Sequence, residues 1–350
     1  MRRLLPGLSL IIRAAILAAA TPPLHAGSPA RVSVEGSQLF ANGHPVLLRG
    51  VNVSAYSDDD SDDVAEVLAR ISESDYKAIA REGFNAVRLN LWSKAFAGEA
   101  GWAWLRRQRE WASKHGLWII LDLHAPPGGY QGPEYKGAFW KDPALRRATV
   151  ALWEKIIAEV RDDPAIAALD ILNEPNPPHD EDWHRFVAAA LPAIRKAGWS
   201  GPVIVEKSLA KGAGLRKLND PEIIYDAHFY EPWEFVTGRK YCYGVAPAPY
   251  ERSGVFDRAW LARTLLEELS AFGERHRVPV NVGEYGMKRE AEGRGGLAWL
   301  GDLEELFEQN GVSRQFWCWH TFTGWALDHS ASSSVNPQRV EALAVLQKSR

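Results

Sequence analysis

The sequence predicts an α/β fold, a single (β/α)8 (TIM) barrel, on three observations. Short apolar segments that resemble strands alternate with amphipathic segments that resemble helices along residues 31–350. These apolar segments contain few polar positions, which is typical of parallel strands buried on both faces. The first of them is not followed by the glycine-rich phosphate loop that a doubly wound sheet would usually carry. A chain of 350 residues is also an ordinary size for one barrel domain.

Eight segments are expected to form strands, and they lie at residues 46–53, 84–91, 117–124, 167–174, 202–206, 222–230, 278–286 and 313–320. Seven helices are expected between or after them, at residues 75–82, 102–115, 144–161, 181–196, 259–275, 297–309 and 337–348. The link at 207–220 shows no helical pattern. Residues 31–50 alternate and turn at "NG", which predicts a β-hairpin that caps the bottom of the barrel.

The first 26 residues resemble a secretory signal peptide. Arg2 and Arg3 precede an apolar stretch that ends in small residues before Ala26. Arg13 interrupts that stretch, and neither half approaches the ~18 apolar residues that span a bilayer. We therefore expect residues 1–26 to be removed, residues 27–350 to form one domain, and the protein to be exported to the periplasm or the medium.

Composition excludes several classes of partner. The net charge is −3, which gives no strong attraction to nucleic acid or to an anionic membrane. We expect a monomer without stable membrane association. Fifteen Trp residues are many for this length, and indole rings can stack on sugars as well as fill a core. Cys242 and Cys318 show no metal-site spacing, and they are either two separate thiols or one bridge.

Polar and aromatic side chains end nearly every expected strand. Chemistry in such barrels takes place at the C-terminal ends of the strands, so we expect these side chains to meet at one mouth. Each has a structural alternative, such as a surface carboxylate, an ion-pair partner, a core histidine or barrel filling. The site would be absent only if the structural alternative were correct for every one of these residues. The residues are Arg88, His124, Asn173, Glu174, His228, Tyr230, Glu284, Trp317 and Trp319.

Two of these residues are carboxylates on well separated strands, Glu174 in "ILNEPNPP" and Glu284 in "VNVGEYG". Two carboxylates across a barrel mouth suit cleavage of a glycosidic bond, because one can donate a proton while the other attacks the anomeric carbon. Pro175 turns the chain away from helix, which keeps the adjacent Asn173 and Glu174 on the rim.

The neighbours of the carboxylates fit this chemistry. Arg88 is expected to keep Glu284 ionised, and the phenol of Tyr230 is expected to hydrogen-bond the same carboxylate. The amide of Asn173 is expected to bind a sugar 2-hydroxyl.

Seven segments resemble glycoside hydrolase family 5, the cellulase-type retaining β-glycosidases, over essentially all of residues 31–350. They are "LRGVNVS", "NAVRLNLW", "LWIILDLHAPPGG", "ILNEP", "DAHFYEPWEF", "VNVGEYG" and "FWCWHTF". The resemblance implies that Glu174 is the general acid/base and Glu284 the nucleophile, with no cofactor and no catalytic metal. It implies that the other residues bind substrate, namely Arg88, Asn173, His124, His228, Tyr230 and the stacking Trp317, with Trp319 as a second claimant. We also expect a cis peptide bond from Trp317 to Cys318.

The leading hypothesis for function is an endo-β-1,4-glucanase. The alternatives are a β-1,3-glucanase or β-mannanase, a transglycosylase, and a non-catalytic carbohydrate-binding barrel. "DLHAPPGGYQG" and "FWCWHTFTGWALD" are closer to family members that cut β-1,3-glucans, whereas "HFYEPWEFVTG" resembles bacterial cellulases. Tyr130, Trp140 and Trp233 lie in loops on the same side and are either platforms for further sugars or local packing.

Overall fold

The computed structural model describes residues 29–55, 62–132, 138–251, 253–320, 324–328 and 338–348. The segment expected to be a signal peptide, residues 1–26, lies outside the described residues. Among the helices of the described ranges, none is long and apolar enough to cross a membrane.

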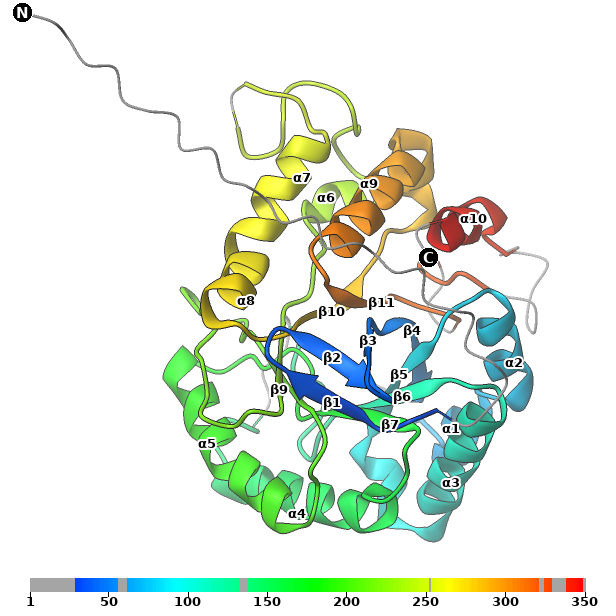
Figure 1. Ribbon diagram of the computed structural model, residues 1–350, viewed down its shortest axis with the longest axis vertical. Coiled ribbons are helices and arrows are strands. Elements are labelled where there is room, and N and C mark those ends of the chain that lie inside the picture. Colours follow the sequence, from blue (N-terminus) through cyan, green and yellow to red (C-terminus); the bar gives the residue numbers. More distant parts are fainter. Residues whose placement is uncertain are drawn as a thin grey trace, which may run out of the picture.

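Eight parallel strands close into a barrel in the order of the chain, which confirms the predicted fold class (Figure 1). The last strand pairs with the first, Arg314 opposite Arg49, and so closes the ring. The barrel strands are β4 (Arg49–Ala55), β5 (Ala86–Trp92), β6 (Trp118–Ala125), β7 (Ile166–Asp170), β8 (Val203–Glu206), β9 (Ile223–Asp226), β10 (Val280–Tyr285) and β11 (Ser313–Phe316).

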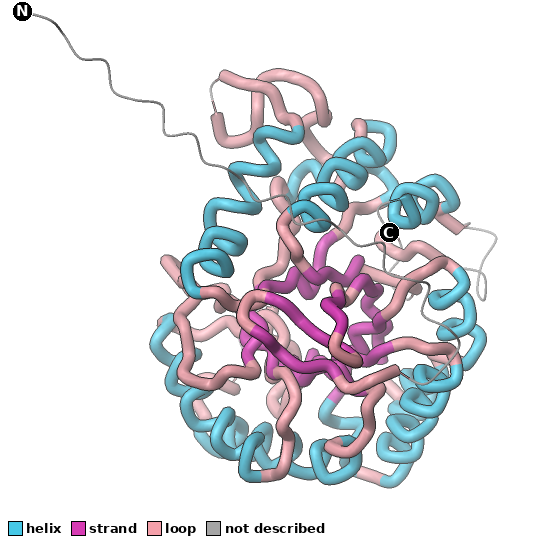
Figure 2. Tube along the Cα trace, in the orientation of Figure 1, coloured by secondary structure: helices cyan, strands magenta, loops and turns pink. Residues whose placement is uncertain are grey.

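Helices surround the strands as an outer ring (Figure 2). Its helices are α2 (Glu73–Arg81), α3 (Glu99–Lys114), α4 (Pro143–Val160), α5 (Asp180–Lys196), α7 (Arg258–Leu265), α8 (Ala271–His276), α9 (Gly296–Gln309) and α10 (Val340–Lys348). Shorter elements are α1 (Val64–Ala69), α6 (Trp233–Val236), the 3-10 turns η1 (Ser93–Ala97) and η3 (Arg289–Arg294), and the π-helical turn η2 (Leu266–Ser270), which joins α7 to α8. The link at 207–220 contains no helix, as expected.

A small antiparallel sheet covers the bottom of the barrel, and it has one strand more than the expected hairpin. Its strands are β1 (Val32–Glu35), β2 (Gln38–Ala41) and β3 (His44–Val46). The turn from β2 to β3 uses Asn42 and Gly43 with φ of 53° and 75°, the left-handed pair that a tight hairpin requires. Leu39 of β2 packs in one apolar cluster with Trp118 and Ile120 of β6. The sheet therefore closes the end of the barrel opposite to the expected site.

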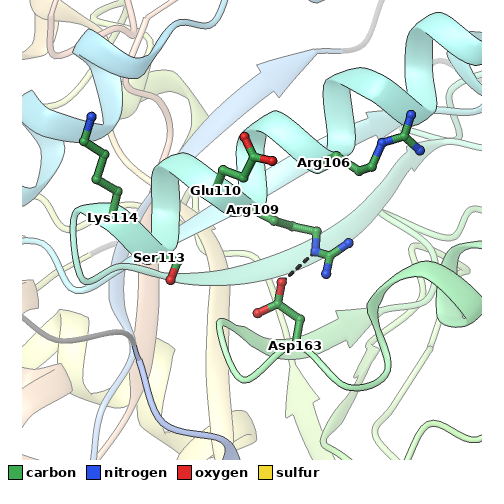
Figure 3. A pocket seen from close by; sticks show the side chains of 6 residues that line it. All are labelled: Arg106, Arg109, Glu110, Ser113, Lys114 and Asp163. Carbon is green, nitrogen blue, oxygen red and sulfur yellow. Dashed lines mark hydrogen bonds and ion pairs between the residues drawn. The ribbon is translucent and has the colours of Figure 1, made fainter.

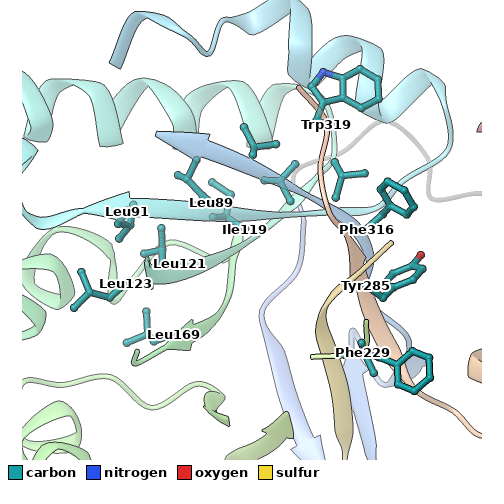
Figure 4. Packing of buried hydrophobic residues seen from close by; sticks show 14 of the residues in the cluster. Leu89, Leu91, Ile119, Leu121, Leu123, Leu169, Phe229, Tyr285, Phe316 and Trp319 are labelled. Carbon is teal, nitrogen blue, oxygen red and sulfur yellow. The ribbon is translucent and has the colours of Figure 1, made fainter. Parts of the chain in front are cut away.

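The barrel strands carry their polar side chains on the inner face. On β5, Leu89 and Leu91 belong to the apolar layer between the barrel and the helices, which Figure 4 shows in part. Arg88 and Asn90 alternate with them, and both are fully buried inside the barrel. An apolar strand thus delivers a charged residue to the interior of the barrel.

Three strands end earlier than the sequence predicts. β7 ends at Asp170 rather than at residue 174, β9 ends at Asp226, and β11 ends at Phe316. Isolated backbone hydrogen bonds continue beyond these ends, such as Asn173 N–H to the Leu123 carbonyl at 3.2 Å. Beyond the end of β7 the backbone bends, with Glu174 at φ 41°. Most of the expected site residues therefore lie in the first residues after the strands, whereas Arg88, His124 and Glu284 lie inside β5, β6 and β10.

The two cysteines are separate thiols, the first of the two alternatives left open by the sequence. Cys242 is exposed and Cys318 is buried. The peptide bond from Trp317 to Cys318 is cis, as expected.

Candidate active site

The guanidinium of Arg88 is the centre of the site, and it is fully buried. Its Nε and Nη2 atoms donate to Asp170 Oδ2 at 3.0 and 2.9 Å, and its Nη1 donates to Glu284 Oε1 at 2.9 Å. Nη2 also donates to Asn173 Oδ1 at 2.8 Å and to Glu206 Oε1 at 3.0 Å. A buried charge is tolerated only when it is paired and hydrogen-bonded. The guanidinium therefore holds acceptors from several strands in one place.

Glu284 near the end of β10 has a donor on each carboxylate oxygen. Arg88 donates to Oε1, and the Tyr230 hydroxyl donates to Oε2 at 2.9 Å. Burial raises the pKa of Glu284, and the positive charges of His228 and Arg88 offset this effect in part. Arg88 and Tyr230 contact Glu284 as expected, but burial has the larger influence on its pKa.

Glu174 faces the same space from the segment after β7. Its Oε2 accepts a hydrogen bond from the Tyr130 hydroxyl at 2.7 Å, and its Oε1 lies 3.1 Å from His228 Nδ1. Its backbone N–H donates to Glu206 Oε2 at 2.8 Å. Burial would raise the pKa of Glu174, but the hydrogen bonds and charge of His228, with Tyr130, outweigh it and lower that pKa to about 2.

The two glutamates are close enough for double displacement. One carboxylate oxygen of Glu174, one of Glu284 and a ring nitrogen of His228 all lie within 4.8 Å of one another. Retaining glycosidases place their two carboxyl groups ~5–5.5 Å apart, whereas inverting enzymes leave ~6.5–9.5 Å for a water. The spacing matches the retaining arrangement.

His228 is surrounded by carboxylates. Its Nδ1 lies 3.1 Å from Glu174 and 3.5 Å from Glu284, and its Nε2 lies 3.4 Å from Glu206 and 3.9 Å from Asp226. Burial would lower the pKa of His228, but Glu206, Glu284 and Glu174 outweigh it and raise that pKa well above its ordinary value. The two shifts therefore favour a proton on the imidazole over a proton on the Glu174 carboxylate.

His124 and Trp317 form one wall of the site. The His124 ring stacks between Tyr130 and Trp317, with centroids 5.6 and 5.4 Å away. Its Nδ1 lies 2.7 Å from Asp122 Oδ2, and its Nε2 lies 3.4 Å from Asn173 Nδ2. A proton on Nδ1 that bonds Asp122 leaves Nε2 free to accept from the amide, which fixes the tautomer.

The structure places Trp319 away from this cluster. Its indole is 1% exposed, packs in the core and donates from Nε1 to Asp75 of α2 at 3.3 Å. Figure 4 shows the ring on the outer side of the strands. Of the two tryptophans named for stacking, Trp317 is the one that stacks on His124 of the site.

The three loop aromatics divide between the alternatives. Tyr130 contacts Glu174, as described above. Trp140 packs edge-on against Phe139, with ring centroids 5.0 Å apart, and this is local packing. Trp233 is 49% exposed and lies beside Tyr230 and Trp325, with centroids 6.1 and 5.9 Å away.

Three sets of acidic and histidine atoms among the described residues are close enough together to bind a cation: Glu174, His228 and Glu284; Glu206, Asp226 and His228; Asp122, Asp170 and Glu206. Arg88 already pairs with all three carboxylates of the last set at 2.9–3.1 Å. His228 contributes its own positive charge to the other two sets. The side chains thus supply their own counter-charges, and the absence of a catalytic metal or cofactor stays a prediction.

A hollow on the outer side of α3 has a different character (Figure 3). Arg109 Nε pairs with Asp163 Oδ2 at 2.6 Å, and Lys114 Nζ pairs with Glu73 at 2.6 Å. These paired charges are those of a solvated helix surface. The residues that line the hollow are Arg106, Arg109, Glu110, Ser113, Lys114 and Asp163.

Comparison with known families decides the class of enzyme. The sequence profile of the cellulase family, glycosyl hydrolase family 5, matches residues 39–323. The chain belongs to glycosyl hydrolase family 5. This family is a retaining one, so the chain is a retaining glycoside hydrolase, and polysaccharides are the typical substrates of the family.

Individual family 5 relatives are distant. Endoglucanase C of Acetivibrio thermocellus is 23% identical over 287 residues, which cover 71% of this chain and 83% of the relative. The probable glucan 1,3-beta-glucosidase A of Emericella nidulans is 26% identical over 180 residues, 47% of this chain and 44% of the relative. Thermotoga maritima Cel5A in complex with mannotriose has a similar fold, with a TM-score of 0.67 at 20% identity over 86% of this chain and 97% of that chain.

The family 5 site also contains buried carboxylates that the sequence reasoning did not select. Asp170, Glu206 and Asp226 lie at the ends of β7, β8 and β9, and all three are at most 3% exposed. Burial, with Glu206 nearby, raises the pKa of Asp226 to about 7. Gly283 makes room for this cluster, because a Cβ there would lie 3.0 Å from Asp226 Oδ2. The signal that finds them is the one used for Glu174, a carboxylate near the end of an apolar strand.

We predict that Tyr230→Phe raises the pKa of the Glu284 carboxyl further, because a hydrogen bond to the charged form is lost. Carbon-13 NMR titration of the glutamate side chains measures this change directly. Tyr243→Phe is the matched control, since Tyr243 bonds Asp302 at 2.6 Å. An unchanged Glu284 titration in Tyr230→Phe would show that the phenol does not stabilise that carboxylate.

Proposed function

We propose that this family 5 enzyme is an endo-β-1,4-glucanase in which Glu174 is the general acid/base and Glu284 is the nucleophile. The observation that carries the proposal is the pair of glutamate oxygens within 4.8 Å, each carboxylate held by its own donors. The spacing suits attack by one carboxylate while the other transfers a proton.

In the first step, Glu284 Oε forms a bond to the anomeric carbon and the glycosidic bond breaks. The leaving oxygen takes a proton from the Glu174 carboxyl and departs as an alcohol. Arg88 and Tyr230 orient the attacking carboxylate through their hydrogen bonds at 2.9 Å. Glu284 loses its negative charge because its carboxylate becomes the ester of the glycosyl-enzyme.

The proton for this step comes from His228. The imidazolium Nδ1 lies 3.1 Å from Glu174 Oε1, within hydrogen-bond reach. When a sugar fills the site and excludes water, transfer of this proton neutralises both partners and gives a protonated Glu174 beside the leaving oxygen. In the second step, Glu174 as carboxylate removes a proton from water, the water oxygen bonds to the anomeric carbon, and Glu284 is released.

The substrate assignment is supported by the name endoglucanase carried by relatives aligned over most of their length. Two observations favour other β-linked glycans. The shorter alignment to a probable glucan 1,3-beta-glucosidase agrees with the "DLHAPPGGYQG" segment and favours a β-1,3-glucan. The mannotriose bound to a structure of similar fold makes a β-mannan a further candidate.

An aromatic platform extends the site beyond the cleavage point. Trp233 and Trp325 lie 5.9 Å apart at an interplanar angle of 31°, and the Tyr230 ring stands against both. Trp233 is one of few large apolar side chains that are exposed among the residues that the structure describes. Flat apolar rings at this place suit stacking of a second sugar of the same chain.

For the N-terminal segment, we propose removal after Ala26 and export of a monomer.

The substrate proposal is tested with cello-, laminari-, manno- and xylo-oligosaccharides of matched length. We expect cello-oligosaccharides to be cut internally and with the highest kcat/KM. Preferred cleavage of laminari- or manno-oligosaccharides would replace the β-1,4-glucan assignment. Products longer than the substrate would show transglycosylation, and no cleavage of any of them would contradict the proposed activity.

We predict that Glu174→Ala lowers kcat by about 10²–10⁴-fold on oligosaccharides, because their leaving group needs a proton. Formation of the glycosyl-enzyme from a dinitrophenyl glycoside should be slowed far less, and azide should restore turnover by replacing the water that needs a base. Stopped-flow release of dinitrophenol measures the first step. An equal loss on both kinds of substrate would argue against the acid role.

We predict that Trp233→Ala raises KM for long oligosaccharides by about five-fold, the equivalent of roughly one aromatic contact. An aryl monoglycoside should keep its KM, because its single sugar does not reach the platform. Trp233→Phe retains a ring and should lose less. Equal KM changes for short and long substrates would remove Trp233 from the binding site.

A further inference from the structure

Glu206 connects the two glutamates proposed to act on the substrate. It is the last residue of β8 and is 3% exposed. Its Oε2 accepts the backbone N–H of Glu174 at 2.8 Å, and its Oε1 accepts from Arg88 Nη2 at 3.0 Å. Through its other terminal nitrogen, Arg88 holds Glu284 Oε1. One buried carboxylate therefore contacts the backbone of one glutamate and the side chain that holds the other.

The bond to the Glu174 backbone is needed because that backbone has an uncommon conformation. Glu174 has φ 41°, a left-handed region that residues with a side chain seldom adopt. β7 has ended four residues earlier, so the ladder no longer fixes the chain at this point. A carboxylate that accepts a backbone N–H forms a strong, charge-assisted hydrogen bond. Glu206 can thus hold Glu174 in the direction that points its side chain at Glu284.

Glu206 also faces His228. His228 Nε2 lies 3.4 Å from Glu206 Oε1, while its Nδ1 faces Glu174. Glu206 itself is held in place at the backbone, where its carbonyl accepts from Trp183 Nε1 at 2.8 Å. Its negative charge therefore stays on the side of the imidazole opposite to the glutamate that needs the proton.

We propose that Glu206 is a positioning residue that fixes the backbone of Glu174 and pairs with the Nε2 side of His228, which leaves Nδ1 directed at Glu174. The proposal rests on the proposed roles of Glu174 and Glu284. Nothing in the contacts of Glu206 requires it to touch the sugar, so its effect is exerted on kcat through these neighbours.

The charged groups around Glu206 and His228 determine the direction of the pH effect. A negative charge raises the pKa of every neighbouring acid, and its removal lowers the affinity of the His228–Glu174 pair for their shared proton. The basic limb of the kcat profile should therefore move to lower pH. The other charged groups that face Glu206 or His228 are Arg88 from β5, Asp122 from β6, Asp170 from β7, Asp226 from β9 and Glu284 from β10.

Two variants separate charge from geometry. Glu206→Gln keeps an acceptor for the Glu174 N–H and removes the charge, and Glu206→Ala removes both. We expect kcat to fall about ten-fold in the first and about 10²-fold in the second, with KM changed less than about three-fold, as for misplaced catalytic groups. In Glu206→Gln the basic limb should move down by about one pH unit.

Glu268→Gln is the matched control, because Glu268 pairs with Lys207, the next residue, at 2.6 Å on the surface. It should leave kcat, KM and both pH limbs unchanged. If Glu206→Ala does not fold at the assay temperature, the nearly isosteric Glu206→Gln decides. Wild-type kcat with an unmoved basic limb in Glu206→Gln would overturn this inference while leaving the proposed function intact. A wild-type enzyme that cleaves no β-linked oligosaccharide would instead overturn the proposed function.

Discussion

The burial of one guanidinium among carboxylates is the constraint on which the site depends. Arg88 leaves no part of its side chain exposed, and it reaches acceptors on β6, β7, β8 and β10. Burying the guanidinium costs free energy unless each of its donors has an acceptor, and burying the carboxylates costs free energy unless the guanidinium pairs with them. The strands that carry these acceptors are therefore held at a fixed mutual distance, so the glutamates are arranged before a sugar binds.

Negative charge still exceeds positive charge in this layer. Six carboxyl groups, those of Asp122, Asp170, Glu174, Glu206, Asp226 and Glu284, share the interior with Arg88 and two histidines. Carboxylates so close together cannot all be ionised without a counter-charge. His228 is the place where the excess is reduced, because it contacts carboxylates on both sides of its ring. The proton that a glycosidase of family 5 needs is thus stored one hydrogen bond from the residue proposed to use it.

The sequence sufficed for the barrel and for the principal residues, and particular elements show why it stopped there. The alternation of apolar segments determined eight strands and their order. The polar residues in or just after β5, β6, β7, β9 and β10 identified Arg88, His124, Glu174, His228 and Glu284 as neighbours. Asp170 and Asp226 were missed because their strands were predicted to run on to residues 174 and 230, which placed both carboxylates in the middle of a strand. Glu206 was passed over although it ends its predicted strand. The sequence also placed Trp319 at the mouth of the barrel. In the structure, the chain bends after β11 and returns that indole to the core. The strand ends were placed too late where the backbone leaves the ladder, as at Glu174.

The most direct test of the central claim is mass spectrometry of the enzyme after reaction with a dinitrophenyl 2-deoxy-2-fluoro-β-cellobioside. The fluorine slows both steps, and the activated leaving group restores the first, so the glycosyl-enzyme accumulates. Double displacement with Glu284 as the attacking group predicts one added sugar unit on the peptide that contains "VNVGEYG". A label on any other residue, or inverted anomeric configuration in the first product seen by NMR, would contradict this account.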